Sequence, residues 1–228
     1  MKIYFANMYG AKGLEHYLKR KIDILAAFPS FSKKGIVEKP PFCNNLFIDS
    51  GAFGKDSKKV NLDNYINFIK ENYSLIDVYA NLDVIGDPKQ TYKNQLKMEK
   101  AGLNPIPVFH YGSNKKWLEK YLNQEYSYIS LGGMVPINGR QLRLWLDDIW
   151  QDYLVQSNGE ACIKVHGFGL QYPDFIQRYP WYSIDASSVH IIARYGGIFT
   201  PWGTFKINPK VSSQEMQWQI RTPKILEQ

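Results

Sequence analysis

The sequence lacks long apolar runs and has very little cysteine. No stretch approaches the roughly 18 consecutive apolar residues that a membrane-spanning helix needs, so we expect no membrane span. The first ten residues, MKIYFANMYG, have no apolar segment behind a basic start, so we predict no secretory signal. The two cysteines, Cys43 and Cys162, lie in or beside apolar strand-like runs. Their positions favour buried free thiols and a cytoplasmic location over a disulfide framework.

Two common ligand-binding motifs are also missing. Four scattered histidines and two distant cysteines give no C-x-C or C-x-x-C pattern, so we expect no metal site. There is no G-x-x-x-x-G-K-[ST] phosphate loop, and the segment His166-Gly167-Phe168-Gly169 resembles a phosphate-binding glycine turn only weakly. We therefore predict no bound cofactor.

The chain does have an excess of positive charge and enough apolar residues for one sizeable core. Its 228 residues are 44% apolar, which suits a single domain. A net charge of +7 suggests a polyanionic partner, and nucleic acid is the usual one. The alternative is that the lysine clusters only form a solvated surface.

Eight short apolar runs alternate with segments of helical periodicity. The runs cover residues 3–6, 23–28, 45–48, 77–82, 106–109, 128–131, 161–165 and 181–184. Helices are expected near residues 12–20, 61–74, 87–102, 117–122, 142–158 and 173–178. This alternation predicts an α/β fold with a parallel sheet, and eight units suggest a compact (β/α)₈ TIM barrel. An open, doubly wound sheet is the structural alternative. We assign residues 1–203 to the barrel domain and residues 204–228 to a tail or helix packed on it.

Polar residues or glycines follow or end six of these runs. They are Asp49, Asp83, His110, the pair Gly132 and Gly133, His166 and Asp185. Each has an ordinary structural explanation: an aspartate can cap a turn, a histidine can be a structural residue, and paired glycines can form a tight turn. Barrel enzymes, however, carry their active sites at the carboxyl ends of the strands. The pattern therefore predicts that three carboxylates converge on one pocket.

Carboxylates crowded in a barrel mouth suit the cleavage of glycosidic bonds. One carboxylate attacks the sugar through an oxocarbenium-like transition state, and a second carboxyl group protonates the leaving group. A third carboxylate can accept hydrogen bonds from a bound base. Glycines allow backbone N–H groups to approach a planar ligand closely.

Four segments resemble motifs of the tRNA-guanine (queuine) transglycosylase family. Residues 47–53, FIDSGAF, resemble the family's DSGGF motif, and residues 131–134, LGGM, resemble IGGL. Residues 108–112, VFHYG, resemble the segment that carries VQG in the family. Asp185 and the stretch RYGGIFT at 194–200 resemble the nucleophile strand and the RNG…FT segment after it. The order of the motifs matches the family along the patches between residues 49 and 208.

The resemblance implies a TIM barrel that exchanges guanine for a 7-deazaguanine by double displacement. It implies that Asp185 is the nucleophile that attacks C1′ and that Asp49 is the general acid/base. The remaining implied substrate-binding residues are Asp83 for the purine edge, Gly132 and Gly133 for the carbonyl oxygen of the base, and His110, Ser50 and His166 around them. For His166, a structural role at the strand end is equally open. Arg194 is expected to hold a nucleic-acid phosphate, or else to pair with an acidic neighbour.

The sequence departs from the family pattern at three points. The zinc motif of three cysteines and a histidine after the nucleophile is absent, His110 replaces the glutamine that contacts the base, and no glutamate follows the GGM segment. The short, zinc-free form is more similar to the 7-deazaguanine DNA transglycosylases of phages and bacterial genomic islands. We therefore predict a DNA substrate, with tRNA as the alternative. The target guanine would be flipped out of the duplex, because C1′ and the base edge must both enter the pocket.

Two further functions remain open on the sequence alone. A nucleoside or sugar glycosidase of the same architecture would release the base without an incoming one. A non-catalytic, nucleic-acid-binding barrel would use the basic surface only. The incoming base, the oligomeric state and any helper protein are not determined by the sequence.

Overall fold

The computed structural model describes residues 1–6, 8–10, 18–31, 38–52, 60–124, 126–170, 172–186, 197–200 and 203–206. The chain divides into two compact units, Met1–Ala186 and Ser187–Gln228. The described part of the second unit is an antiparallel pair of strands, β9 (Gly197–Thr200) and β10 (Gly203–Lys206). The division at Ala186 precedes the boundary at residue 203 that the sequence suggested. Residues 204–206 belong to strand β10, whereas residues 207–228 lie outside the described residues.

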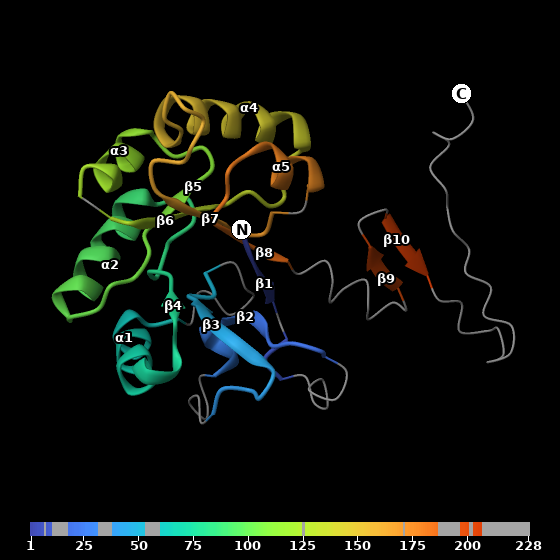
Figure 1. Ribbon diagram of the computed structural model, residues 1–228. Coiled ribbons are helices and arrows are strands. Elements are labelled where there is room, and N and C mark those ends of the chain that lie inside the picture. The colour runs from blue at the N-terminus through green and yellow to red at the C-terminus, as the bar shows by residue number, and fades with distance from the viewer. Residues whose placement is uncertain are drawn as a thin grey trace, which may run out of the picture. The chain divides into compact units, whose positions relative to one another are not determined.

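The first unit is an α/β fold built on one curled, all-parallel sheet of eight strands (Figure 1). The order of strands across the sheet is β4-β3-β2-β1-β8-β7-β6-β5. Consecutive strands are therefore adjacent in the sheet except β4 and β5, which stand at its two ends, and β1 also pairs with β8. The strands are β1 (Lys2–Ala6), β2 (Ile22–Ala27), β3 (Cys43–Asp49), β4 (Val78–Tyr79), β5 (Val108–His110), β6 (Tyr128–Gly132), β7 (Lys164–Gly167) and β8 (Ser183–Ala186).

Five described α-helices surround the sheet on its outer side, from α1 to α5 in Figure 1. They are α1 (Leu62–Glu71), α2 (Pro88–Lys100), α3 (Lys116–Leu122), α4 (Gly139–Ile149) and α5 (Pro173–Arg178); a short π-helix, η5 (Trp150–Leu154), extends α4, and two 3₁₀ turns are η2 (Phe28–Ser30) and η4 (Tyr73–Leu75). Asp87 caps α2 by accepting a hydrogen bond from the Gln90 N–H, and Pro88 occupies the first turn, as predicted. None of the described helices combines the length and apolar character that would let it cross a membrane.

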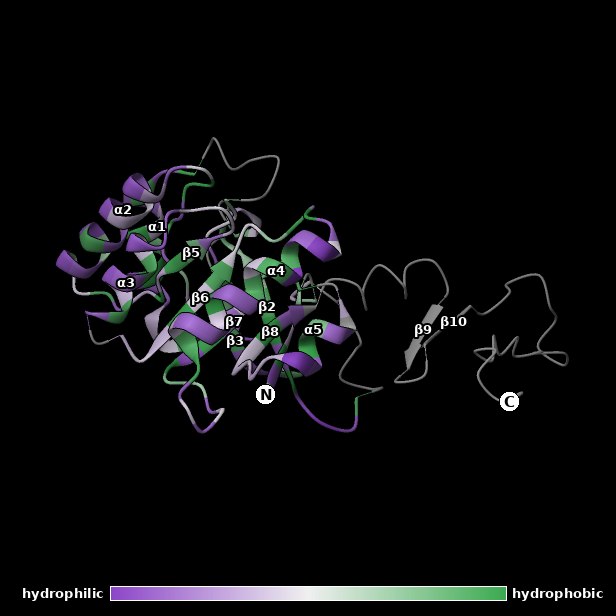
Figure 2. Ribbon diagram, turned by 90° about the horizontal axis from the view of Figure 1, so that it is seen from above, coloured by the Kyte–Doolittle hydropathy of each residue, from purple (hydrophilic) through white to green (hydrophobic). Residues whose placement is uncertain are grey.

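Alternate side chains of the strands point to opposite faces of the sheet. One set packs against the helices. Figure 2 shows the strands mainly in green, the colour of hydrophobic residues, whereas the helices carry both purple and green residues. The other set forms an inner core on the concave face: Tyr4, Ala6, Leu25, Phe47, Ala80, Ile106 and Val108, with Val78, Tyr128 and Phe168 packed against them. The ring centroids of Phe47 in β3 and His166 in β7 lie 4.8 Å apart. Strands that are far apart in the sheet order therefore meet inside the curl.

A short backbone link also joins the two ends of the sheet. Ala80, just after β4, and Ile106, just before β5, form an isolated parallel bridge. The Ile106 N–H donates to the Tyr79 carbonyl at 2.9 Å, and the Asn81 N–H donates to the Ile106 carbonyl at 3.1 Å. These bonds bring the first and last strands of the sheet order within pairing distance over one residue pair.

All eight predicted strands are present, and so are the helices expected in the described regions after β3. Two local predictions are wrong. The long helix ends at Leu154 rather than near Gly159, because Val155 turns to an extended conformation and pairs with Ala161. Cys162 is exposed rather than buried, because β7 begins two residues later, at Lys164; Cys43 is buried, and both thiols are free.

The turn after β3 depends on a glycine. Gly51 has φ +81°, and a Cβ atom there would lie 2.5 Å from Cδ of Pro29. We expect Gly51→Ala to lower the free energy of unfolding by about 2 to 4 kcal/mol, from the unfavourable φ and the overlap together. Urea unfolding followed by tryptophan fluorescence measures this change.

Gly86 provides the matched control for Gly51. Its φ is +83°, but no atom lies within 4 Å of the position a Cβ would take. Gly86→Ala therefore carries only the conformational cost, about 1 kcal/mol. Equal losses in the two variants would show that contact with Pro29 contributes nothing.

Candidate active site

The carboxyl ends of the strands bring the predicted site residues to one edge of the curled sheet. Asp49 ends β3, His110 ends β5 and Gly132 ends β6. His166 and Asp185 lie one residue before the ends of β7 and β8. Because all eight strands are parallel, these ends share one edge, which is where ligands bind in parallel α/β sheets.

Asp49 is an acid whose pKa is displaced far from its usual value. Its pKa is raised from 3.8 to about 7, mainly by burial and in addition by the negative charges of Asp83 and Asp185. The backbone N–H groups of Gly51 and Ser50 lower it, the first from 3.3 Å. A carboxyl group with this pKa is partly protonated at neutral pH. It can therefore both give and take a proton during a reaction.

Asp83 is held from two sides beyond the end of β4. The Ser50 hydroxyl donates to its Oδ1 at 2.7 Å, and Nε2 of His110 lies 2.7 Å from its Oδ2. The side chains of His110 and Asp83 are only 4% and 10% exposed. Each carboxylate oxygen can accept a second hydrogen bond, so Asp83 keeps acceptor capacity for N–H groups of a ligand.

The glycine pair after β6 makes room for His110. A Cβ on Gly132 would lie 3.2 Å from Cδ2 of His110 and 3.1 Å from Cγ1 of Val108. Gly133 has φ +66°, a conformation that side chains disfavour. The glycines therefore allow the imidazole to reach Asp83, besides presenting backbone at the sheet edge.

Asp185 is fixed through one oxygen and open at the other. The Gly169 N–H donates to Oδ1 at 2.6 Å, and Nε2 of His166 lies 3.7 Å from the same oxygen. Among the described residues, none donates a hydrogen bond to Oδ2. The residue is 7% exposed. Gly169 itself has φ +63°, so its backbone conformation favours glycine.

His166 lies beneath the edge rather than on it. The residue is fully buried, and its Nδ1 lies 2.6 Å from the hydroxyl of Ser183. No residue that the structure describes forms a hydrogen bond with its Nε2. Burial lowers the pKa of this imidazole, and the neighbouring Asp185 opposes that shift only in part. The placement favours support of Asp185 over direct contact with a sugar or phosphate.

Arg194 lies outside the described residues. The same holds for Phe53 of the FIDSGAF segment and for residues 194–196 of the RYGGIFT stretch, whose last four residues form β9. Within the part of the chain that the structure describes, no group of three or more His, Cys, Asp or Glu side chains is arranged to hold a metal ion.

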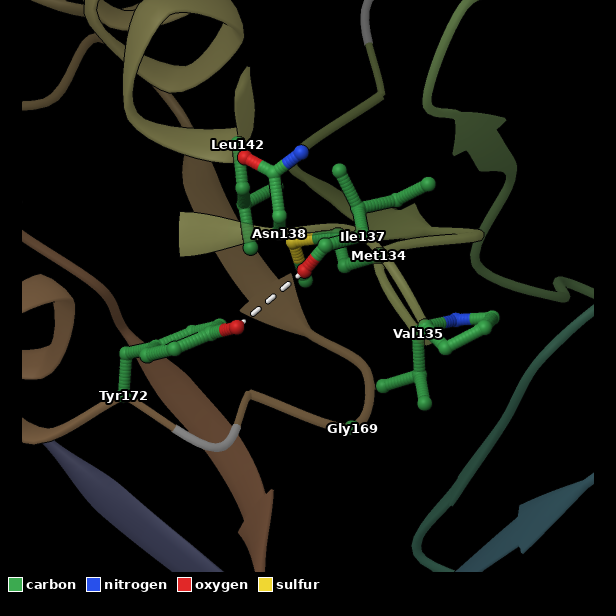
Figure 3. A pocket seen from close by; sticks show the side chains of 8 residues that line it. Met134, Val135, Ile137, Asn138, Leu142, Gly169 and Tyr172 are labelled. Carbon is green, nitrogen blue, oxygen red and sulfur yellow. Dashed lines mark hydrogen bonds between the residues drawn. The ribbon is translucent and has the colours of Figure 1, made fainter. Parts of the chain in front are cut away.

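A cavity of about 250 Å³ lies between the loops after β6 and β7 (Figure 3). Its lining is mostly apolar: Met134, Val135, Pro136, Ile137, Asn138, Leu142, Gly169 and Tyr172. The Tyr172 hydroxyl donates to the Ile137 carbonyl at 3.2 Å and ties the two loops together. Gly169 connects this cavity to the carboxylate, because its N–H holds Asp185.

Sequence reasoning missed three features of the site: the cavity, the Gly169 contact and the partner of His166. The only available signal for Gly169 was the His-Gly-Phe-Gly run, which suggested a weak phosphate turn. Ser183 lies within an apolar run and gave no signal, although its alternation with Asp185 places both on the concave face.

Comparison with known proteins adds no assignment. No model of a known protein family matches the chain. No curated protein matches it either.

Proposed function

We propose that the protein exchanges guanine in DNA for a 7-deazaguanine through a covalent sugar intermediate on Asp185. The observation that carries this proposal is the pairing of two different carboxyl groups at one sheet edge. Asp49 has a pKa of about 7 and shares the edge with Asp185, whose Oδ1 is held by the Gly169 N–H and whose Oδ2 accepts no hydrogen bond from the described residues. This is the division of roles that nucleophilic cleavage of a glycosidic bond needs.

The steps follow from these roles. Oδ2 of Asp185 attacks C1′, the C1′–N9 bond breaks, and its electron pair leaves with guanine, which receives the proton of Asp49. The incoming base then gives a proton to the Asp49 carboxylate, and its nitrogen attacks C1′ and releases Asp185. Asp83 accepts N–H groups of the base edge, and the backbone at Gly132 and Gly133 faces the base.

A closed (β/α)₈ barrel is part of the proposal. The hydrogen bonds between Tyr79, Ile106 and Asn81 support closure between β4 and β5. The inner core supports it as well, because side chains from across the sheet fill its concave side. Closure would place the strand ends in a ring around one pocket.

Positive charge supports DNA as the partner. The chain carries a net charge of +7. Exposed lysines, Lys89 and Lys116, lie in the first turns of α2 and α3, which follow the carboxyl ends of β4 and β5. Such charges near the site edge would contact phosphates and make binding depend on salt.

An exchange assay tests the proposal. We expect labelled guanine to enter duplex or single-stranded DNA, and tRNA to stay unlabelled. Labelling of tRNA alone would reassign the substrate. Release of guanine from DNA without any incoming base would identify a glycosidase. DNA binding without exchange or release would leave only the non-catalytic function.

A further inference from the structure

A chain of hydrogen-bonding groups runs beneath Asp185. The Tyr128 hydroxyl lies 2.5 Å from the hydroxyl of Ser183, which lies 2.6 Å from Nδ1 of His166. Nε2 of His166 then lies 3.7 Å from Oδ1 of Asp185. Strand β7 pairs with β6 on one side and with β8 on the other, so the sheet itself sets these spacings.

Aromatic side chains surround His166 in the described part of the chain. The ring centroids of Phe47 and Phe168 lie 4.8 Å and 4.4 Å from that of the imidazole, and the Tyr4 ring lies at 6.1 Å. Nε2 is buried without a hydrogen bond among the described residues. An unsatisfied buried nitrogen costs free energy, so its protonation state matters to the carboxylate it faces.

Two tautomers of a neutral imidazole are possible, and the geometry separates them. With hydrogen on Nδ1, the lone pair of Nε2 would face the carboxylate oxygen of Asp185 in a dry site, which is repulsive. With hydrogen on Nε2, that N–H faces Oδ1, and Nδ1 accepts from Ser183. Ser183 in turn accepts from Tyr128.

The groups at both ends of this series of hydrogen bonds, Tyr128 and His166, favour donation from Tyr128 to Ser183 and from Ser183 to Nδ1. Burial raises the pKa of Tyr128, so the phenol keeps its proton and remains a donor. Burial lowers the pKa of His166, so the imidazole is neutral at pH 7 and has only one N–H. A cationic imidazolium would instead pair with Asp185 and weaken it as a nucleophile.

We propose that His166 is a positioning residue, fixed by Ser183 and Tyr128 as the Nε2–H tautomer, which holds Oδ1 of Asp185 and leaves Oδ2 to attack. The Gly169 N–H is the second group that holds Oδ1. Closing the 3.7 Å separation by roughly 0.7 Å would bring N–H and oxygen to hydrogen-bond distance, and such contacts tighten in reacting complexes. Oδ1 becomes the carbonyl oxygen of the sugar ester and still accepts both hydrogen bonds.

The tautomer can be measured without any assay of activity. Long-range ¹H–¹⁵N correlation spectra of protein with ¹⁵N-labelled histidine distinguish the two neutral tautomers and the cation, and His166→Asn identifies the His166 signals. We expect the Nε2–H tautomer at pH 7, and a midpoint of protonation below pH 6.5, the ordinary pKa. The Nδ1–H tautomer or an imidazolium at pH 7 would overturn the proposal. In Ser183→Ala, Nδ1 of His166 loses the hydrogen bond that it accepts from the Ser183 hydroxyl. We then expect both neutral tautomers to be populated and to interconvert.

The positioning role rests on the proposed function and has its own test. His166→Gln keeps an N–H near the place of Nε2, whereas His166→Asn is too short to reach Asp185. We expect single-turnover formation of the covalent DNA complex to slow by about 100-fold in His166→Asn and by much less in His166→Gln, with DNA affinity unchanged in both.

Equal slowing in the two variants, or slowing that parallels a loss of thermal stability, would show a structural role only. Failure of the proposed function has a different signature. The wild-type protein would then form no covalent complex at all, while the tautomer observed by NMR would be unaffected.

Discussion

Replacing Asp185 by asparagine should abolish the covalent complex with DNA and lower base exchange by roughly four orders of magnitude or more. Losses of this size follow removal of a nucleophile in other enzymes. The amide is nearly isosteric, and its oxygen can still accept from the Gly169 N–H, so the fold and the cavity should persist. It cannot, however, form an ester with C1′, because an amide nitrogen is not a competent nucleophile.

The measurement is denaturing electrophoresis of the protein incubated with a DNA oligonucleotide, with and without an incoming base. Wild type should give a band that survives denaturation and disappears when the base is added. Asp63→Asn is the matched control: it makes the same chemical change on the exposed face of α1, where Asp63 pairs with Lys97. A stable adduct in Asp185→Asn would remove Asp185 from the nucleophile role.

Much of this fold was predictable because its strands carry their own signal. The run Leu46-Phe47-Ile48 is apolar on both faces, as a strand between helices and an inner core must be. Ile129 and Val165 are buried on the face of the sheet that packs against the helices. The element boundaries were less accurate. Cys162 continues an apolar run in sequence, yet it precedes β7 and is exposed. The start of a strand depends on where its backbone pairs with the neighbouring strand, and β7 pairs with β6 only from Lys164 onward.

The site was predictable in its residues but not in its contacts. Asp49, Asp83, His110 and Asp185 follow from one rule, that parallel strands share a carboxyl edge. The rule does not say which side chains bond to each other. That His110 pairs with Asp83, while His166 turns inward to Ser183, depends on side-chain direction and on the space left by Gly132, which only the three-dimensional structure provides.

Asp49 should give the second large effect, and its direction depends on pH. Because its pKa is about 7, the protonated form, which donates to guanine in the proposed mechanism, dominates below pH 7 and disappears above it. Formation of the covalent complex should therefore fall about tenfold per pH unit above 7, and release by an incoming base should fall below 7, since that step needs the carboxylate. Asp49→Asn should slow both steps by about 100-fold to 10,000-fold and remove both pH dependences. A wild-type profile that is flat between pH 6 and 8 would contradict the role.

The same raised pKa means that Asp49 lowers the free energy of unfolding at neutral and alkaline pH. Its folded-state pKa lies above the unfolded value of 3.8, so the folded state binds the proton more tightly. As pH rises from 3.8 to about 7, the unfolded state ionises first and stability is lost, up to about 4 kcal/mol. Asp49→Asn carries no such charge. It should therefore gain stability over wild type in urea unfolding at pH 8 and much less at pH 5, with Asp63→Asn as the control. A variant that loses activity yet gains stability at pH 8 is the expected behaviour of a catalytic acid, because the burial and negative neighbours that raise its pKa also oppose folding.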